Sequence, residues 1–170
     1  MLKIFKALAS KHKEPKRKGC SLYVLPDNSV IIQGYSYENH SPGFVNSRNI
    51  VRISEELIPV LLGELVITIT NTTKFIDLKE WVKDHDSYTK AFLSFADYKN
   101  YRRLEKEAAY VFIELENNVI TITPTEYGLY GRGGFGFLVN KEVTCSPDAE
   151  SIYQHLIPLL KRSNYEHLAS

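Results

Sequence analysis

Two short runs of alternating apolar and polar residues, joined by Asn117-Asn118, constrain the fold of this chain more than any other feature. Residues 111–116 place Val, Ile and Leu at every second position, and residues 119–123 alternate again up to Pro124. A period of two is typical of β-strands that bury one face. Asn tolerates the positive φ angles that a tight turn between two strands requires. The stretch therefore predicts a β-hairpin whose second strand stops at Pro124.

A segment rich in glycine and aromatic residues follows the hairpin, at residues 127–137. Its glycines lie between two expected strands. A Walker loop or a dinucleotide fingerprint joins a strand to a helix instead, so we interpret the segment as a sharp loop or bulge. Aromatic residues and Arg are enriched at the energetic centres of protein interfaces, which favours a partner-contacting loop over an RNA-binding one. The predicted contact residues here are Tyr127, Tyr130, Arg132 and Phe135.

An earlier part of the chain follows a similar plan. Residues 21–25 and 30–33 predict two strands around the turn sequence 26–29, and a tyrosine-containing loop is expected at 34–43. Residues 28–31 align with 117–120, and residues 57–62 align with 156–161. A diverged internal duplication is one interpretation, and chance similarity of short apolar stretches is the other. By analogy, the earlier loop is predicted to contact a partner through Tyr35, Tyr37, Glu38 and His40.

Helices are expected elsewhere, together with a short strand at 44–50. Ser54 and the two acids after it predict a helix start with an irregularity at Pro59. The β-branched residues at 66–70 favour a strand over a continued helix. Residues 88–107 predict one long helix, and Ser146-Pro147-Asp148 predicts the start of a last helix with His155 near its core face. Hairpins combined with helices predict an α+β fold: one domain with an antiparallel or mixed sheet and helices packed on it.

Charge is distributed unevenly along the 170 residues, although the net charge is only +1. Seven of the 21 Lys and Arg residues, but only one acid, Glu14, lie in the first 18 positions. We therefore expect a basic flexible leader at 1–18 and a single domain at 19–170. That domain carries 14 positive and 19 negative charges, which argues against nucleic acid as the main partner and suits a basic protein. No apolar run reaches the length of a membrane span and no signal peptide is recognised, so a cytoplasmic protein without a membrane partner is expected.

Signals for catalysis are weak. The five histidines contain no His-x-x-x-His pair, and in Asp84-His85-Asp86 neighbouring side chains diverge. There is no Gly-x-Ser-x-Gly motif, and Cys20 and Cys145 lack the spacing of a redox or metal motif, so reduced thiols are expected. We predict no enzyme activity, no catalytic residue, no metal, no cofactor and no small-molecule substrate.

The chain resembles the contact-dependent growth inhibition (CDI) immunity proteins. The resemblance is clearest in residues 94–109, in the strand pair 110–124, in Gly133-Gly134-Phe135, in Glu142-Val143 and in the helix 148–163. A looser match covers residues 25–32 and 52–62, so that the likeness spans most of 20–164. It is a pattern of apolar and turn positions and contains no diagnostic motif.

This resemblance implies a non-enzymatic cytosolic protein that binds and neutralises a cognate toxin domain. It also implies that the toxin is a metal-dependent, DNase-like nuclease, held partly by a toxin β-hairpin that adds to the sheet of the immunity protein. An exposed sheet edge is chemically suited to such β-augmentation. The alternative is a nucleic-acid-binding module that uses the basic leader and the loop around Arg132.

Overall fold

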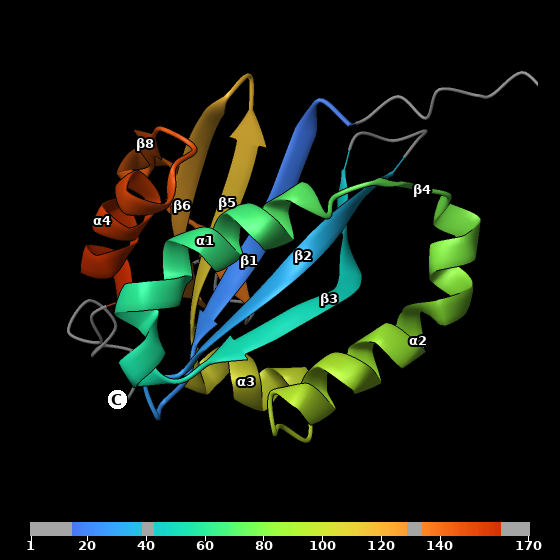
Figure 1. Cartoon of the computed structure of the whole chain (residues 1–170). Helices are drawn as coiled ribbons and strands as arrows, with labels where there is room; N and C mark the ends of the chain where they lie inside the picture. The colour runs from blue at the N-terminus through green and yellow to red at the C-terminus, as the bar shows by residue number, and fades with distance from the viewer. Residues whose placement is uncertain (1–14, 39–42, 129–133, 161–170) are drawn as a thin grey trace, which may run out of the picture.

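A mixed β-sheet with helices on both faces forms the centre of the protein in the computed structural model, which describes residues 15–38, 43–128 and 134–160 (Figure 1). Eight strands within these residues follow the order β3-β2-β1-β5-β6-β7, with β4 beside β2 and β8 beside β6. The strand pairs are antiparallel except β2–β4. The strands are β1 Arg17–Val24, β2 Val30–Glu38, β3 Phe44–Ile53, β4 Phe75–Ile76, β5 Ala109–Glu116, β6 Val119–Tyr127, β7 Phe135–Phe137 and β8 Val143–Cys145. The predicted α+β fold is thereby confirmed.

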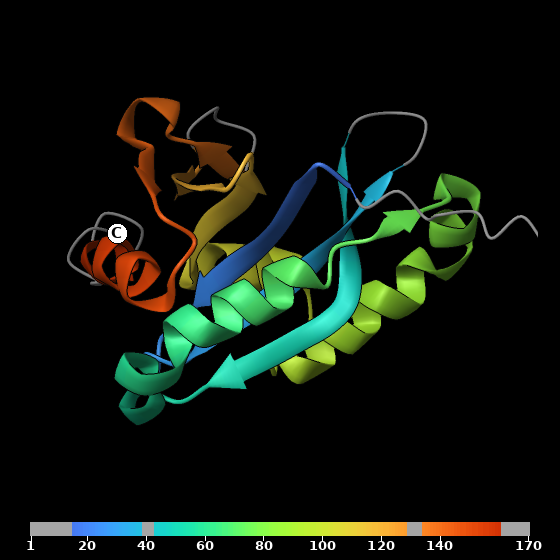
Figure 2. The same ribbon diagram turned by 45° about the horizontal axis from the view of Figure 1, so that its top comes forward.

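The helices divide between the two faces of the sheet. Helices α1 and α4 cover one face, and α3 with the end of α2 covers part of the other (Figures 1 and 2). Helix α2 also follows the outer side of β3. The helical elements are η1 Glu55–Leu57, α1 Ile58–Asn71, α2 Leu78–Phe95, α3 Tyr101–Glu107, η2 Val139–Lys141 and α4 Ala149–Leu160. Among the helices of the described residues, none is long and apolar enough to cross a membrane.

The predicted hairpin at Asn117-Asn118 is confirmed as β5–β6. Both turn residues have positive φ angles, 50° and 63°, as a two-residue turn between twisted strands requires. Pro124, however, does not end β6, which continues to Tyr127. Along this edge of β6, strand β8 pairs with residues up to Ile122, and strand β7 pairs with residues from Thr125 onward. Pro124 lies in the gap between them, where its missing N–H costs no ladder hydrogen bond.

The first hairpin, β1–β2, is longer than the sequence predicts. Strand β1 begins at Arg17, so Arg17 and Lys18 belong to the sheet although the sequence placed them in the leader. Strand β2 runs on to Glu38, so the loop expected from residue 34 begins later. Arg17 is accommodated because its guanidinium pairs with Glu114 of β5. The extension brings Tyr35 and Tyr37 of β2 onto the sheet.

The strand expected at 66–70 was predicted wrongly, because these residues are part of helix α1. The helix runs unbroken from Ile58 to Asn71 and buries Leu62, Val66 and Ile69 against the sheet. These residues recur at the spacing of one helix face, and their burial outweighs the weak preference of β-branched residues for strands. The irregular start expected near Pro59 is confirmed by the short turn η1.

The long helix expected at 88–107 is two helices. The chain leaves α2 through Asp97, whose φ of 62° is left-handed, and re-enters α3 where the Asn100 side chain accepts a hydrogen bond from the Arg103 N–H. The last helix is confirmed as α4, but it begins at Ala149, just after the residues 146–148 expected to start it, and the Asp148 side chain accepts from the Ser151 N–H. His155 does not face the core as expected: it is exposed, with Nδ1 2.7 Å from the Ser151 carbonyl oxygen.

Candidate partner-binding surface

The aromatic residues predicted to contact a partner, where the structure describes them, come from two segments that meet on the sheet face opposite α1 and α4. The first segment is the end of β2 and the second comprises β7 and the end of β6. Phe112 of β5 joins them, because its ring centroid is 5.7 Å from that of Tyr35 and 5.7 Å from that of Phe137. We define the aromatic layer as Tyr35, Tyr37, Phe44, Tyr110, Phe112, Tyr127, Phe135 and Phe137. Their rings form two groups of contacts, and the hydroxyls of Tyr35 and Tyr110 join the two groups.

The eight predicted residues differ in what they present to solvent. Tyr37, Tyr127 and Phe135 are partly exposed, whereas Tyr35 and Glu38 are 7% and 4% exposed. In this conformation Tyr35 supports the surface from below, and Glu38 is buried at the end of β2. His40, Tyr130 and Arg132 lie outside the described residues.

Tyr35 shows what this support consists of. Its hydroxyl lies 2.8 Å from the hydroxyl of Tyr110, which joins β2 to β5 across the aromatic layer. Burial raises the pKa of both phenols, so both are neutral at physiological pH. The pair thus fixes the rings beneath the exposed part of the surface.

Arg17 is a charged residue of this surface that the sequence analysis missed. Its guanidinium donates to Glu114, with Nη2 2.7 Å from Oε2, and lies 5.6 Å from the centre of the Phe44 ring. The hydrogen bond to Glu114 raises the pKa of Arg17, and Tyr37 contributes in the same direction. Arg17 therefore connects a predicted tyrosine to the acidic strand β5. The assignment of Arg17 to the leader hid this contact.

A groove of about 370 Å³ opens beside Arg17 on the same face. Its walls carry the carboxylates of Glu114, Glu116 and Glu142, and its apolar lining comes from Phe112, Phe137 and Val139, with Thr121 and Thr123 on β6. We call it the acidic groove. The alternation of Glu114 and Glu116 with Ile113 and Leu115 was visible in the sequence. The sequence did not predict that Glu142, which follows η2, lies beside these two carboxylates.

A second open region lies between β3 and α2. Strand β3 ends the strand order, and α2 contacts its outer side through a few long side chains. Trp81 Nε1 donates to the Asn46 carbonyl oxygen at 3.0 Å, and Arg48 donates to Ser87 at 3.0 Å. A pocket of about 700 Å³ lies between this part of β3, β4 and the start of α2. We call this region the α2–β3 cleft.

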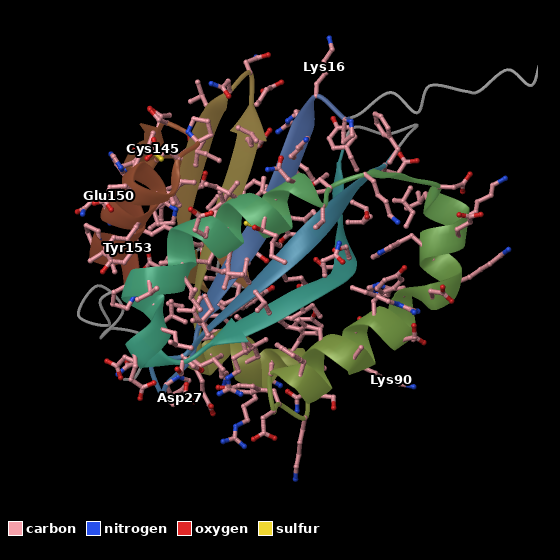
Figure 3. The ribbon with its side chains drawn as sticks, in the orientation of Figure 1. Lys16, Asp27, Lys90, Cys145, Glu150 and Tyr153 are labelled. Carbon is pink, nitrogen blue, oxygen red and sulfur yellow. The ribbon has the colours of Figure 1, made fainter. Side chains whose placement is uncertain are left out.

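Reactive groups are few in the part of the chain that the structure describes. Cys20 and Cys145 are free thiols, as expected. Burial raises the pKa of Cys20 to about 12, and burial also raises that of Cys145. Figure 3 shows Cys145 beside α4, on the side of the molecule away from Lys90 of α2. A thiol with a raised pKa is a poor nucleophile, so neither cysteine is activated.

The Asp84-His85-Asp86 segment forms part of α2, with all three side chains exposed. The His85 ring packs on Trp81, with 4.4 Å between ring centres. Among residues 15–38, 43–128 and 134–160, there is no group of three or more His, Cys, Asp or Glu side chains suited to a metal ion. The surface is thus equipped for contact through rings, carboxylates and strand edges.

Comparisons with known proteins show a matching family and similar structures. The profile of the family described as "CdiI: CDI immunity protein" matches residues 46–152. A protein of unknown function from Neisseria meningitidis, NMB0488, has a similar structure, with a TM-score of 0.67 and 14% identity over 89% of this chain and 97% of that one. A CdiA-CT/CdiI toxin and immunity complex from Yersinia pseudotuberculosis contains a chain with a TM-score of 0.64 and 20% identity, covering 88% of this chain and 99% of that one. No curated protein sequence matches.

Proposed function

This chain belongs to the CDI immunity protein family, and we propose that it binds the C-terminal toxin domain of a cognate CdiA protein and neutralises it in the cytoplasm. The observation that carries this proposal is the family match, which includes β5, β6 and most of the surface described above. The Yersinia relative of similar fold was solved in a complex of toxin with immunity protein. The protein acts by binding and not by catalysis.

The charge of the protein supports a basic partner such as a nuclease. Residues 19–170 carry 19 acids and 14 Lys and Arg residues. A nuclease has to bind the phosphates of its substrate, which requires positive charge. A negatively charged inhibitor accelerates association with such an enzyme and disfavours unrelated acidic proteins. We therefore propose a DNase-like toxin.

Strand β3 is the sheet edge that we propose for β-augmentation by a toxin hairpin. It is ten residues long and terminal in the strand order, whereas β7 and β8 on the opposite side are three residues each. A long edge offers an incoming strand more unpaired backbone groups than a short one. The pocket in the α2–β3 cleft leaves space beside this edge. The Gly-rich segment at 127–137, which the sequence analysis favoured for docking, is the competing location.

Hydrogen exchange distinguishes these two locations. Upon binding of the toxin domain, amide groups of Phe44–Ile53 that point to the outer edge should exchange more slowly, at alternate positions, because a β-ladder engages every second residue. Protection confined to β6 and β7 would instead favour the Gly-rich segment. Unchanged exchange at both edges, in a complex that forms, would contradict β-augmentation but not toxin binding.

Purified components test the binding itself. We expect the protein and the C-terminal domain of the CdiA protein encoded beside it to form a stable 1:1 complex in size-exclusion chromatography with light scattering. A toxin domain from an unrelated CdiA protein is the control and should elute separately. Separate elution of the cognate pair would contradict the proposal.

The alternative, a nucleic-acid-binding module, has weaker support. Arg17 at the end of the expected leader is paired with Glu114, and the groove beside it is acidic. Phosphates would be repelled there. Nucleic-acid binding that weakens steeply with salt and disappears on removal of residues 1–14 would favour this alternative.

A further inference from the structure

We propose that the acidic groove receives an Arg or Lys side chain from a cationic segment of the toxin. This inference rests on the proposed function and adds a second contact to the one at β3. The groove lies on β1, β5 and β6 and is bordered by η2. It adjoins the first residue of β3, because Phe44 packs both on Phe112 and against the Arg17 guanidinium. One partner can therefore reach both regions.

The apolar part of the groove fits the stem of a long basic side chain. Phe137 is 46% exposed and Val139 is 65% exposed, which is unusual for large apolar side chains that lie beside one another on one surface. Phe112 is partly buried beneath them. Arg and Lys bury their methylene groups on such surfaces while the charged head stays at a polar rim. An Arg guanidinium also gains from contact with an aromatic ring.

The polar part of the groove fits the charged head. Three carboxylates and one guanidinium line it, which gives a net charge of −2. Glu142 Oε1 accepts a hydrogen bond from the Thr123 hydroxyl at 2.8 Å, so that this carboxylate is oriented from β6. Glu116 is exposed and makes no ion pair within the described part of the chain. Glu116 and Glu142 are thus the two carboxylates available to a partner.

Arg17 is an example of this recognition within the chain itself. Its guanidinium makes a two-pronged contact with Glu114 and lies over the Phe44 ring. A carboxylate next to an aromatic face therefore holds an arginine at this surface already. Glu116 and Glu142 beside Phe137 repeat that combination with space left open. The geometry thus favours a guanidinium over a neutral or anionic group.

The small size of the groove limits how much it can contribute to the affinity for the toxin. A stable protein interface buries about 1,200–2,000 Å² in total, far more than a groove for one or two side chains. We therefore propose that the groove affects the association rate and the choice of partner, whereas most of the contact area lies elsewhere. Charges at the rim of an interface act chiefly on the association rate and on its salt dependence.

Two matched double variants test the inference in the complete protein. E116Q/E142Q removes two charges from the groove, and E56Q/E64Q removes two exposed charges next to and within α1, on the other face. With the cognate CdiA C-terminal domain, we expect association of E116Q/E142Q to slow about tenfold at low ionic strength, with much less effect in high salt. The E56Q/E64Q variant should associate within about twofold of the unmodified protein.

A peptide probe separates this inference from the proposed function. An acetylated, amidated tetra-arginine peptide should shift the NMR signals of Glu116, Phe137 and Glu142 in the unmodified protein, and these shifts should be lost in E116Q/E142Q. If a complex forms but both double variants associate at equal rates, the inference that the groove binds the toxin is overturned and the proposed function stays intact. Groove shifts with the peptide but no complex with the toxin domain would contradict the proposed function, and with it the assignment of the groove to the toxin.

Two other occupants would also be detected. If residues 1–14 of this chain occupied the groove, their removal would change the Glu116 and Glu142 signals without any added ligand. If a second copy occupied it, the same signals would change on dilution. Either result would overturn the assignment to the toxin.

Discussion

At the scale of single residues, Asn118 shows how one position determines a turn. Its φ of 63° lies in the left-handed region, next to Asn117 at 50°. Gly adopts this conformation without strain, whereas Ala costs about 1 kcal/mol. We expect Asn118→Gly to retain or raise the free energy of unfolding in urea and Asn118→Ala to lower it by about 1 kcal/mol. Equal stability of the two variants would contradict the turn geometry.

The buried tyrosines give the protein a characteristic response to alkali. Burial raises the pKa of Tyr23 and Tyr110 well above 10, and it raises those of Tyr98 and Tyr101 to about 12. The unfolded chain therefore loses these protons first as pH rises. Their contribution to stability is complete below about pH 10 and is lost progressively from pH 10 to 12 and above.

A titration that follows tyrosinate absorbance and far-ultraviolet circular dichroism together checks this expectation. A fraction of the 11 tyrosines should ionise only as the circular dichroism signal is lost. In denaturant, the control, all should ionise together near pH 10. Ionisation of every tyrosine near pH 10 in a protein that keeps its native circular dichroism would contradict the burial of these phenols.

At the scale of elements, the contact between α1 and α4 depends on Gly63. A Cβ atom at this position would lie 2.1 Å from the backbone oxygen of Ala149. Helix propensity alone predicts that Ala in place of Gly stabilises a helix by about 1 kcal/mol. Here the clash with backbone dominates, because the two helices would have to move apart.

We therefore expect Gly63→Ala to lower the free energy of unfolding by about 1–3 kcal/mol. Glu64→Ala, at an exposed position of the same helix, is the matched control and should be neutral or slightly stabilising. Chemical denaturation measures both. A stabilised Gly63→Ala variant would show that α1 and α4 do not pack closely in solution.

Elements were predictable from the sequence where local chemistry determines them. The turn at Asn117-Asn118 and the start of α4 at Asp148 depend on neighbouring residues alone, and both were predicted. Residues 66–70 were assigned wrongly because their helical state depends on burial against a distant sheet. The break at Asp97 was not predicted because it contains no glycine or proline.

The internal duplication stays a prediction. Each half of the chain contains a hairpin with an Asn turn, a further strand and a helix on the same face of the sheet. This shared order is compatible with a common origin. It is equally compatible with an independent origin, in which each half packs one helix on three strands in a similar way.

At the scale of the whole molecule, the partner surface exists because β1 pairs with β5. That pairing places Cys20 opposite Ile113 and joins the two halves into one sheet. The aromatic residues of β2 and β7, far apart in the sequence, meet over β5 as a result. The sequence could predict which residue types suit an interface, but not this long-range register. The acidic groove depends on the same register and for this reason escaped the sequence analysis.

The most direct test of the proposed function is protection from the toxin in living cells. Bacteria that express the cognate CdiA C-terminal domain inside the cell should stop growing, and co-expression of this protein should restore growth. An immunity protein from an unrelated CDI system should not restore it. If growth stays arrested while both proteins are present in soluble form at comparable levels, the protein does not neutralise that toxin, and the central claim is contradicted.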